Sequence, residues 1–261
     1  MKKIALITGA SSGMGREFAL QMDCHFHNID EFWLVARREE ELKELADCLQ
    51  HPCRIFPMDI TKLGQLERLE FALRLDDARL CMLIQCAGYG IMGDFEHADR
   101  KETLGMVRLN CEALTELTHR LLPYMSQNAR IILLASSAAF LPQADFAVYA
   151  ASKSYVLSFG RALGAELKDQ NIYVTSVCPG PVDTPFFERA EKNGSTLAIK
   201  KYVMATPEDV VTKALRDSYG KKSVSICGGA MQAFCVLTKL MPHGVLLALA
   251  DLLKHAEGSR L

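Results

Sequence analysis

The sequence lacks a surplus of either charge. It contains 30 Lys and Arg residues against 31 Asp and Glu residues, which gives a formal net charge of −1 at pH 7. Proteins that hold nucleic acid or an anionic lipid surface through charge carry a basic surplus. The composition therefore predicts no nucleic-acid partner and favours chemistry on a small molecule.

Closely spaced cysteine pairs are also missing. The nine cysteines are an odd number, none of them forms a CxxC pair, and most lie in apolar segments. Disulfide scaffolds and zinc sites depend on paired or closely spaced cysteines. We therefore expect buried, reduced thiols, no metal site and a reducing, cytoplasmic location.

Apolar runs long enough to cross a membrane are absent too. The run Ile4 to Ile7 is too short for the core of a signal peptide, so we expect the first strand to start at once. Residues 228–253 are apolar with interruptions at Lys239 and Pro242-His243-Gly244, and neither half reaches the roughly 20 residues that span a bilayer. We expect the extension 228–261 to cap a pocket or form a subunit interface, with peripheral membrane contact ranked below both.

What the sequence does contain is a regular alternation of short apolar runs with longer helical patterns. Strands that are apolar throughout and separated by helices indicate a parallel sheet covered on both faces. We predict the α/β class, as one doubly wound Rossmann domain over residues 1–261 with a mostly parallel seven-stranded sheet. Residues 181–206 lack a clear period and are expected to form a mobile loop with a little helix. The strand runs are 4–7, 32–36, 55–58, 80–87, 130–135 and 172–178, and the helical runs are 13–22, 39–50, 63–75, 100–124 and 147–170.

A glycine motif follows the first expected strand and opens the first expected helix. In this context Gly9 permits a tight turn, Gly13 lets the backbone approach a pyrophosphate, and Gly15 allows the helix to pack closely on the strand. The helix N-terminus then faces the phosphates. An ordinary glycine turn is the minor alternative. The dinucleotide contacts expected here are Gly9, Ser11, Ser12, Gly13, Met14 and Gly15.

The end of the second strand indicates which dinucleotide is bound. A carboxylate at this point would bond the ribose 2′-hydroxyl and repel a 2′-phosphate, but the strand ends in Ala36-Arg37-Arg38. Arg37 can hold a phosphate through a forked, charge-assisted contact. NADP(H) is therefore expected in preference to NAD(H). Arg38 is interpreted as a solvated charge, with contact to the adenine as the alternative.

Asp59 and Ile60 follow the third expected strand. A side chain and the adjacent backbone amide could bracket the adenine there. In the alternative interpretation, Asp59 only caps a helix that begins near Lys62.

Tyr149 and Lys153 are four residues apart in a helical run, and Ser136-Ser137 lies just upstream. At this spacing two side chains share a helix face, so an ammonium beside the phenol would lower the tyrosine pKa towards working pH. A phenol tuned in this way can act as a general acid. The plainer alternative is a half-buried aromatic beside a solvated lysine.

Together with Asn110 and the Pro179-Gly180 turn, these motifs resemble the short-chain dehydrogenase/reductase superfamily, from Lys3 to about Thr184. The resemblance implies hydride transfer between a nicotinamide and a carbonyl or alcohol substrate. It also implies a catalytic tetrad of Asn110, Ser137, Tyr149 and Lys153, in which Lys153 additionally holds the nicotinamide ribose and Asn110 positions a water.

The same resemblance assigns further cofactor contacts. Ala87 and Gly88 would allow close approach of the dinucleotide, and the turn after the sixth strand would run along the nicotinamide through Pro179, Gly180, Val182 and Thr184. Tyr149 and Lys153 would also touch the cofactor.

Three departures from the family pattern stand out. Gln85-Cys86 replaces a pair of asparagines, and Phe140 replaces a glycine, which should narrow the pocket. The interval to Tyr149 is twelve residues from Ser137 and thirteen from Ser136, the commoner spacing. We select Ser137, because the second serine of such a pair is usually the catalytic one.

The sequence therefore predicts an NADPH-dependent carbonyl reductase or alcohol dehydrogenase acting on an apolar substrate. A dinucleotide-binding sensor or scaffold without turnover is the alternative, since fold alone does not decide activity. By resemblance we expect a homodimer or homotetramer built on residues 100–124 and 147–170. Candidates for the substrate wall are Met92, Phe95, Phe186 and Phe187.

Overall fold

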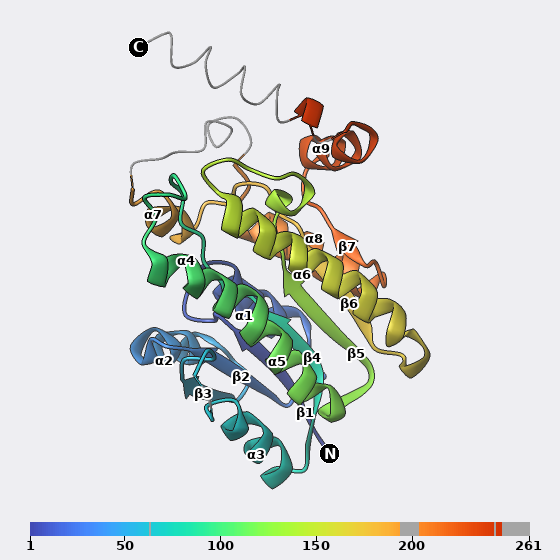
Figure 1. The fold of residues 1–261 in the computed structure, drawn as a ribbon. Coiled ribbons are helices and arrows are strands. Elements are labelled where there is room, and N and C mark those ends of the chain that lie inside the picture. The colour runs from blue at the N-terminus through green and yellow to red at the C-terminus, as the bar shows by residue number, and fades with distance from the viewer. Residues whose placement is uncertain (63, 194–203, 243, 247–261) are drawn as a thin grey trace.

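The computed structural model describes residues 1–62, 64–193, 204–242 and 244–246 (Figure 1). Seven strands of this part of the chain form one sheet in the order β3-β2-β1-β4-β5-β6-β7, and every neighbouring pair is parallel. The predicted α/β class is confirmed, and the sheet is parallel throughout rather than mostly parallel. The strands are β1 (Lys2–Thr8), β2 (Glu31–Ala36), β3 (Cys53–Pro57), β4 (Ala78–Gln85), β5 (Met125–Leu134), β6 (Tyr173–Val177) and β7 (Val224–Ser225).

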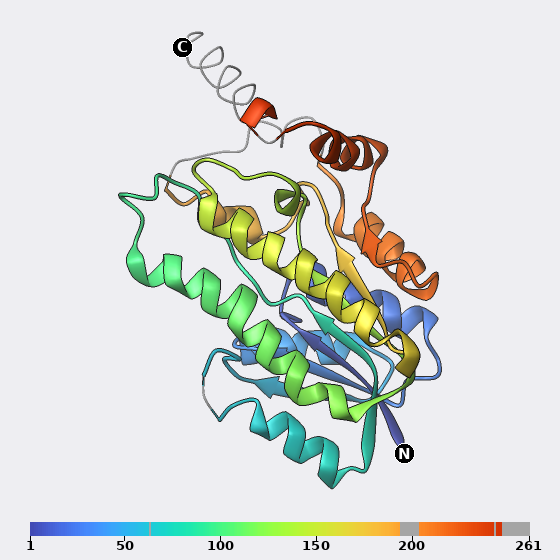
Figure 2. The same ribbon diagram turned by 45° about the vertical axis from the view of Figure 1, so that its right-hand side comes forward.

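Helices cover both faces of this sheet, as Figures 1 and 2 show. One core packs α3, α5 and α6 on the sheet, and the other packs α1, α2 and α8 on the opposite face. Because both faces are covered, the central strands are apolar along their whole length. The helices are α1 (Gly13–His25), α2 (Glu39–Cys48), α3 (Glu67–Leu75), α4 (Arg100–Val107), α5 (Leu114–Leu121), α6 (Ala147–Glu166), α7 (Phe186–Ala190), α8 (Pro207–Tyr219) and α9 (Gly229–Leu240).

The strand order reverses between β1 and β4, whose neighbours on either side continue in opposite directions. In doubly wound sheets this reversal opens a crevice outside the carboxyl ends of the strands. The carboxyl ends lie towards the top of Figure 1, at the same end of the molecule as α7 and α9. The fold therefore places any site built on the strand ends next to these two late helices.

Residues 100–124 do not form the single helix that the sequence predicts. The segment is α4, a π-helical turn η1 (Arg108–Ala113), α5 and a short 3-10 turn η2 (Leu122–Tyr124). A π-helical turn widens the helix locally and is common at functional sites. Here it carries Asn110, one of the predicted catalytic residues.

The C-terminal third is less regular than the rest of the fold. Within residues 181–206, the short helix α7 agrees with the little helix expected in this loop, a bridge joins Val182 and Ala205, and 194–203 lie outside the described residues. The extension after residue 228 begins with α9, while 243 and 247–261 lie outside the description. Among the described helices, none has the length and apolar character needed to traverse a bilayer.

Candidate active site

A cleft of about 1250 Å³ opens at the carboxyl ends of the strands. Its walls come from the glycine loop, the ends of β2, β3, β4 and β5, and from α4, α6, α7 and α9. All the predicted cofactor contacts line it, and so does Ser137; Asn110 is the one predicted catalytic residue outside the lining. The folded chain thus brings together motifs that are up to 175 residues apart, from Gly9 to Thr184.

The glycine loop has the backbone form that a phosphate site needs. Gly9 has φ +69° and a Cβ there would lie 2.8 Å from the Ala87 nitrogen, while a Cβ at Gly15 would clash with the Gly9 carbonyl oxygen. Ser12, the residue before α1, makes no side-chain cap to the helix. The first N–H groups of α1 are thus open to an anion, in a cradle that side chains would fill. This geometry fits a dinucleotide pyrophosphate.

The adenosine end of the cleft carries two arginines with different surroundings. Arg38 donates from Nη2 to Ser11 Oγ at 3.0 Å and pairs with Glu41 at 3.2 Å. It therefore connects β2 with the glycine loop and is not simply the solvated charge that the sequence suggested. Arg37 lines the cleft and makes no ion pair within the described residues. Of these two arginines, Arg37 is the one without an ion pair to a described residue, although its charge acts on the neighbouring Asp59.

Asp59 closes a tight turn at the same end of the cleft. Its carboxylate accepts from the Thr61 backbone at 3.0 Å and from the Thr61 hydroxyl at 2.7 Å. Burial raises the pKa of Asp59, but these bonds and the nearby charge of Arg37 lower it overall. The alternative role as a helix cap is wrong, because α3 begins only at Glu67.

The Gln85-Cys86 departure is accommodated by a bond to α5. Gln85 is buried, and its Nε2 donates to Thr118 Oγ1 at 2.7 Å. The Thr118 hydroxyl in turn donates to the Leu114 carbonyl at 2.7 Å. Ala87 N donates to Thr8 Oγ1 at 3.2 Å, so β4 is still held to β1 beside the cleft. The longer amide of Gln85 therefore ties β4 to the neighbouring helix.

Asn110 braces the loop after β4 rather than lining the cleft. Its Oδ1 accepts from Tyr89 N at 3.1 Å, and its Nδ2 donates to Tyr89 O at 2.9 Å and to Ser152 Oγ at 3.0 Å. A Cβ at Gly88 would lie 3.0 Å from Asn110 Oδ1 and 3.3 Å from Lys153 Nζ. The widened turn η1 thus sets Asn110 between Gly88 and α6, close to the lysine.

Tyr149 and Lys153 are both buried on the inner side of α6, with 7% and 4% of their surfaces exposed. Lys153 Nζ donates to the Leu134 carbonyl at 2.7 Å and lies 5.6 Å from the centroid of the Tyr149 ring. The plainer interpretation, a solvated lysine beside a half-buried aromatic, is wrong. Both side chains belong to the cleft.

The pKa values of this pair differ from the sequence expectation. Burial raises the pKa of Tyr149 to about 12, against a lowering by a hydrogen bond from Ser136. Burial likewise lowers the pKa of Lys153 to about 8. The expected depression of the tyrosine pKa is therefore not a property of the protein alone, because desolvation disfavours both charged forms.

Ser136, not Ser137, is the serine whose side chain lowers the Tyr149 pKa. The Ser136 hydroxyl is the hydrogen-bond partner that lowers the Tyr149 pKa, and its oxygen accepts from Ala138 N at 3.2 Å. Ser137 begins the 3-10 turn η3 (Ser137–Phe140), and its backbone N donates to Pro179 O at 2.8 Å. The commoner thirteen-residue interval was the signal that favoured Ser136.

The buried lysine predicts a pH dependence of stability. Between about pH 8 and its unfolded pKa of about 10.5, Lys153 binds a proton in the unfolded chain but not in the folded one. The free energy of unfolding should therefore rise with pH across this interval, and below it the penalty of a buried charge is fully present. Urea denaturation of the wild type and of Lys153→Met at about pH 7.5 and about pH 9.5 measures the effect. Equal changes in the two proteins would contradict it.

The four candidates for the substrate wall divide into two pairs. Phe186 and Phe187 line the cleft, and the Phe186 ring lies 5.4 Å from that of Tyr149. Phe95 is 67% exposed and Met92 is buried in a small core, and neither reaches the lining. Met231 and Phe234 of α9 also line the cleft. The sequence did not single out these two residues, but they belong to the extension that it predicts as a pocket cap or a subunit interface.

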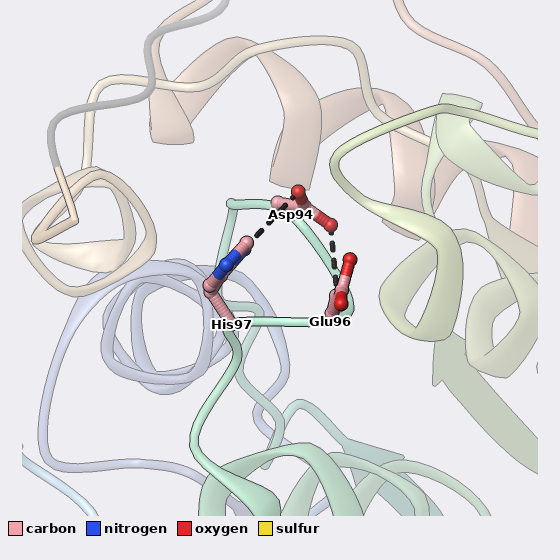
Figure 3. A group of neighbouring side chains, drawn as sticks. All are labelled: Asp94, Glu96 and His97. Atoms are coloured by element: carbon pink, nitrogen blue, oxygen red, sulfur yellow. Dashed lines mark hydrogen bonds and ion pairs between the residues drawn. The ribbon is translucent and has the colours of Figure 1, made fainter.

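One group of possible metal ligands occurs in the described part of the chain. Asp94, Glu96 and His97 place one ligand atom each within 4.8 Å of the others (Figure 3). All three are exposed, and Asp94 accepts from Glu96 N at 3.0 Å in a local turn. Exposed acidic turns of this kind are ordinary surface features, so the group carries no functional assignment.

Comparison with known proteins gives the family. Residues 3–194 match the short chain dehydrogenase family. An uncharacterized oxidoreductase of Staphylococcus epidermidis is 29% identical over 189 residues, which cover 72% of this chain and 81% of that protein. The chain therefore belongs to the short-chain dehydrogenases, which are NAD(P)-dependent oxidoreductases.

Two solved structures share the fold closely. A short-chain dehydrogenase from Sphingobium yanoikuyae in complex with NADPH has a TM-score of 0.75 and 28% identity, covering 87% of each chain. A bulky-bulky ketone specific alcohol dehydrogenase from Comamonas testosteroni has a TM-score of 0.71 and 27% identity, covering 87% of this chain and 86% of that one. Both similarities extend beyond residue 194, the end of the family match.

Proposed function

We propose that this protein is an NADPH-dependent oxidoreductase that interconverts a ketone and its alcohol. The observation that carries the proposal is the convergence of Tyr149, Ser136 and Lys153 at one end of the cleft whose other end is the glycine loop. The polar groups and the anion cradle belong to one continuous space, which is what hydride transfer from a dinucleotide requires.

The roles of the side chains follow from their positions. Ser136 would hold the substrate carbonyl oxygen by donating its hydroxyl proton, and Tyr149 would protonate the same oxygen as it gains negative charge. A raised pKa keeps the phenol protonated at neutral pH, so it is ready to donate. When bound, the nicotinamide supplies the hydride.

Lys153 has two functions in this proposal. Its Nζ makes one hydrogen bond, to the Leu134 carbonyl at 2.7 Å. The ammonium has two further N–H donors, which could bind the nicotinamide ribose. The Lys153 ammonium would be favoured by the negative charge of a bound pyrophosphate, and it would stabilise a tyrosinate after proton transfer. Asn110 holds the adjoining loop in place and is a positioning residue here.

The preference for NADPH rests on Arg37. Small Ala36 ends β2, no carboxylate stands at the strand tip, and the Arg37 guanidinium has no ion-pair partner within the described residues. A free guanidinium at the cleft wall suits a doubly charged phosphate. Ala87, Gly88, Pro179, Gly180, Val182 and Thr184 complete the proposed dinucleotide path, with Thr184 Cβ 3.4 Å from a Cβ built on Gly13.

Titration with NADPH and NADH tests the proposed cofactor preference, and assays on a panel of carbonyl compounds test the proposed activity. We expect NADPH to bind more tightly than NADH, and Arg37→Ala to weaken NADPH binding by about ten-fold or more while NADH binding changes little, since one charge-assisted contact is lost. Isothermal titration calorimetry gives both dissociation constants. Glu41→Gln is the control, because it removes a charge beside Arg38 and leaves Arg37 unchanged. Equal affinities that Arg37→Ala leaves unaltered would rule out a 2′-phosphate contact.

A homo-oligomer is also proposed. Leu104 and Val107 of α4 and Tyr155 of α6 are 42%, 44% and 42% exposed, on the helices that the family resemblance assigns to subunit contact. Exposed apolar side chains on adjacent helices are typical of an interface.

A further inference from the structure

Helix α9 presents two different faces. Met231 and Cys235 are each 6% exposed on its inner face, whereas Val236, Leu237 and Leu240 on the outer face are 56%, 44% and 78% exposed. The inner face packs on the turn after β6, where a Cβ at Gly180 would lie 2.7 Å from Met231 Sδ. The helix therefore lies at the end of the molecule to which the carboxyl ends of the strands point (Figure 2).

Two side chains of this inner face reach the cleft, Met231 and Phe234. The Phe234 ring also lies 6.5 Å from that of Phe140, the last residue of η3. Since η3 directly follows Ser136, α9 forms the wall of the cleft next to the proposed carbonyl-binding serine.

The other wall at this end is aromatic. The Phe146 ring stacks on Tyr149 with a centroid distance of 4.3 Å and an interplanar angle of 21°, and Phe186 approaches Tyr149 from α7 at 5.4 Å. A Cβ at Gly90 would lie 2.7 Å from both Phe146 and Tyr149, so the stack is tightly held. The Tyr149 ring therefore lies among aromatic side chains, in a cleft that Met231 and Phe234 also line.

Charge is distributed unevenly along the cleft. Its lining contains eight Lys and Arg residues and four Asp and Glu residues. Between residues 134 and 149 and on α9, however, the lining residues are all uncharged: Leu134, Ala135, Ser136, Ser137, Ala138, Gln143, Phe146, Tyr149, Met231 and Phe234. An ionised substrate group held against these residues would lose its hydration and would gain no charged partner among them.

We propose that the substrate is a neutral ketone with an aromatic or alicyclic ring, and that Met231 and Phe234 of α9 contact this ring and set its size. Flat rings suit a space lined by aromatic faces and a flexible thioether, which adapts to their edges. This inference rests on the proposed function, since it assigns the substrate of the same site.

Steady-state kinetics with NADPH tests the proposal on acetophenone, acetone and pyruvate, which represent a ring ketone, a small ketone and an anionic ketone. We expect acetophenone to have the highest kcat/KM. Phe234→Ala should reduce kcat/KM for acetophenone by about ten-fold, mainly through KM, because a pocket contact of this size contributes about 10- to 200-fold. Leu237→Ala, on the outer face of the same helix, should change neither value.

A binding measurement separates this inference from the proposed function. Saturation-transfer NMR detects acetophenone on the protein–NADPH complex whether or not it is reduced, and Phe234→Ala should weaken the signal while the NADPH dissociation constant stays unchanged. Ring-ketone binding without turnover would reject the proposed reaction and retain the ring site. Preference for pyruvate, failure of acetophenone to bind, or equal effects of Phe234→Ala and Leu237→Ala would overturn the inference.

Discussion

Tyr149→Phe should reduce kcat/KM for ketone reduction by about 10²- to 10⁴-fold, the usual contribution of a positioned general acid. The variant removes only the hydroxyl that donates the proton and bonds Ser136. The ring remains, so its stacking on Phe146 at 4.3 Å and its contact with Phe186 at 5.4 Å are preserved. NADPH binding and the thermal midpoint should therefore change little, and the loss should appear in the rate of the chemical step. Stopped-flow measurement of NADPH absorbance under single-turnover conditions reports that step directly.

Tyr155→Phe is the matched control for this prediction. Tyr155 lies on the same helix, is 42% exposed, and shares a hydrogen bond of 2.7 Å with Thr115 Oγ1 away from the cleft. Loss of the Tyr155 hydroxyl should leave kcat/KM within about two-fold of the wild type, as expected for a surface change. If Tyr149→Phe behaved like Tyr155→Phe, Tyr149 could not be the proton donor, and a dinucleotide-binding sensor would become the better description of the protein.

Much of the sheet could be predicted from local pattern, because each central strand is buried on both faces and is apolar without interruption. The same reasoning fails for β7, which has only two residues, and for the start of β5, where Gln127 and Asn128 are exposed. It also fails for residues 100–124, where the pattern indicated one helical run and gave no sign of the π-helical turn. Irregular backbone of this kind is specified by tertiary bonds such as those between Asn110 and Tyr89.

The site could be predicted where the residue type or its spacing indicates the local backbone geometry. Gly9 and Gly15 show close approach of backbone segments, and the spacing of Tyr149 and Lys153 shows a shared helix face. Burial was not predictable in the same way. The spacing suggested a lysine that lowers the tyrosine pKa, whereas desolvation of both groups outweighs their mutual effect in the folded protein.

Contacts between distant segments were the least accessible to sequence reasoning. Arg38 reaches Ser11 across 27 positions, and α9 reaches the turn after β6 across about 50. No local period reports such pairs, because each residue type is also common on an exposed surface. The choice between Ser136 and Ser137 is of the same kind, since it depends on how η3 turns after β5.

The two serines should differ sharply when each is replaced by alanine. Ser136→Ala should lower kcat/KM by about 10²- to 10³-fold, the range found when one donor to a developing oxyanion is removed. Ser137→Ala should remain within a few-fold of the wild type, since its backbone bond to Pro179 at 2.8 Å does not involve the side chain. Ser136 Oγ also accepts from Ala138 N, so Ser136→Ala additionally loses a cap that contributes about 1 kcal/mol to stability.

Ser136→Thr separates the catalytic from the structural contribution of this side chain. Threonine keeps both the donor to the carbonyl oxygen and the acceptor for Ala138 N, so it should restore a large part of the activity. Thermal unfolding of the three variants shows how much stability the cap supplies, independently of turnover. Loss of activity in Ser137→Ala together with full activity in Ser136→Ala would return the carbonyl contact to Ser137. In that case the bond between Ser136 and Tyr149 would only orient the phenol, and η3 would have to rotate when substrate binds.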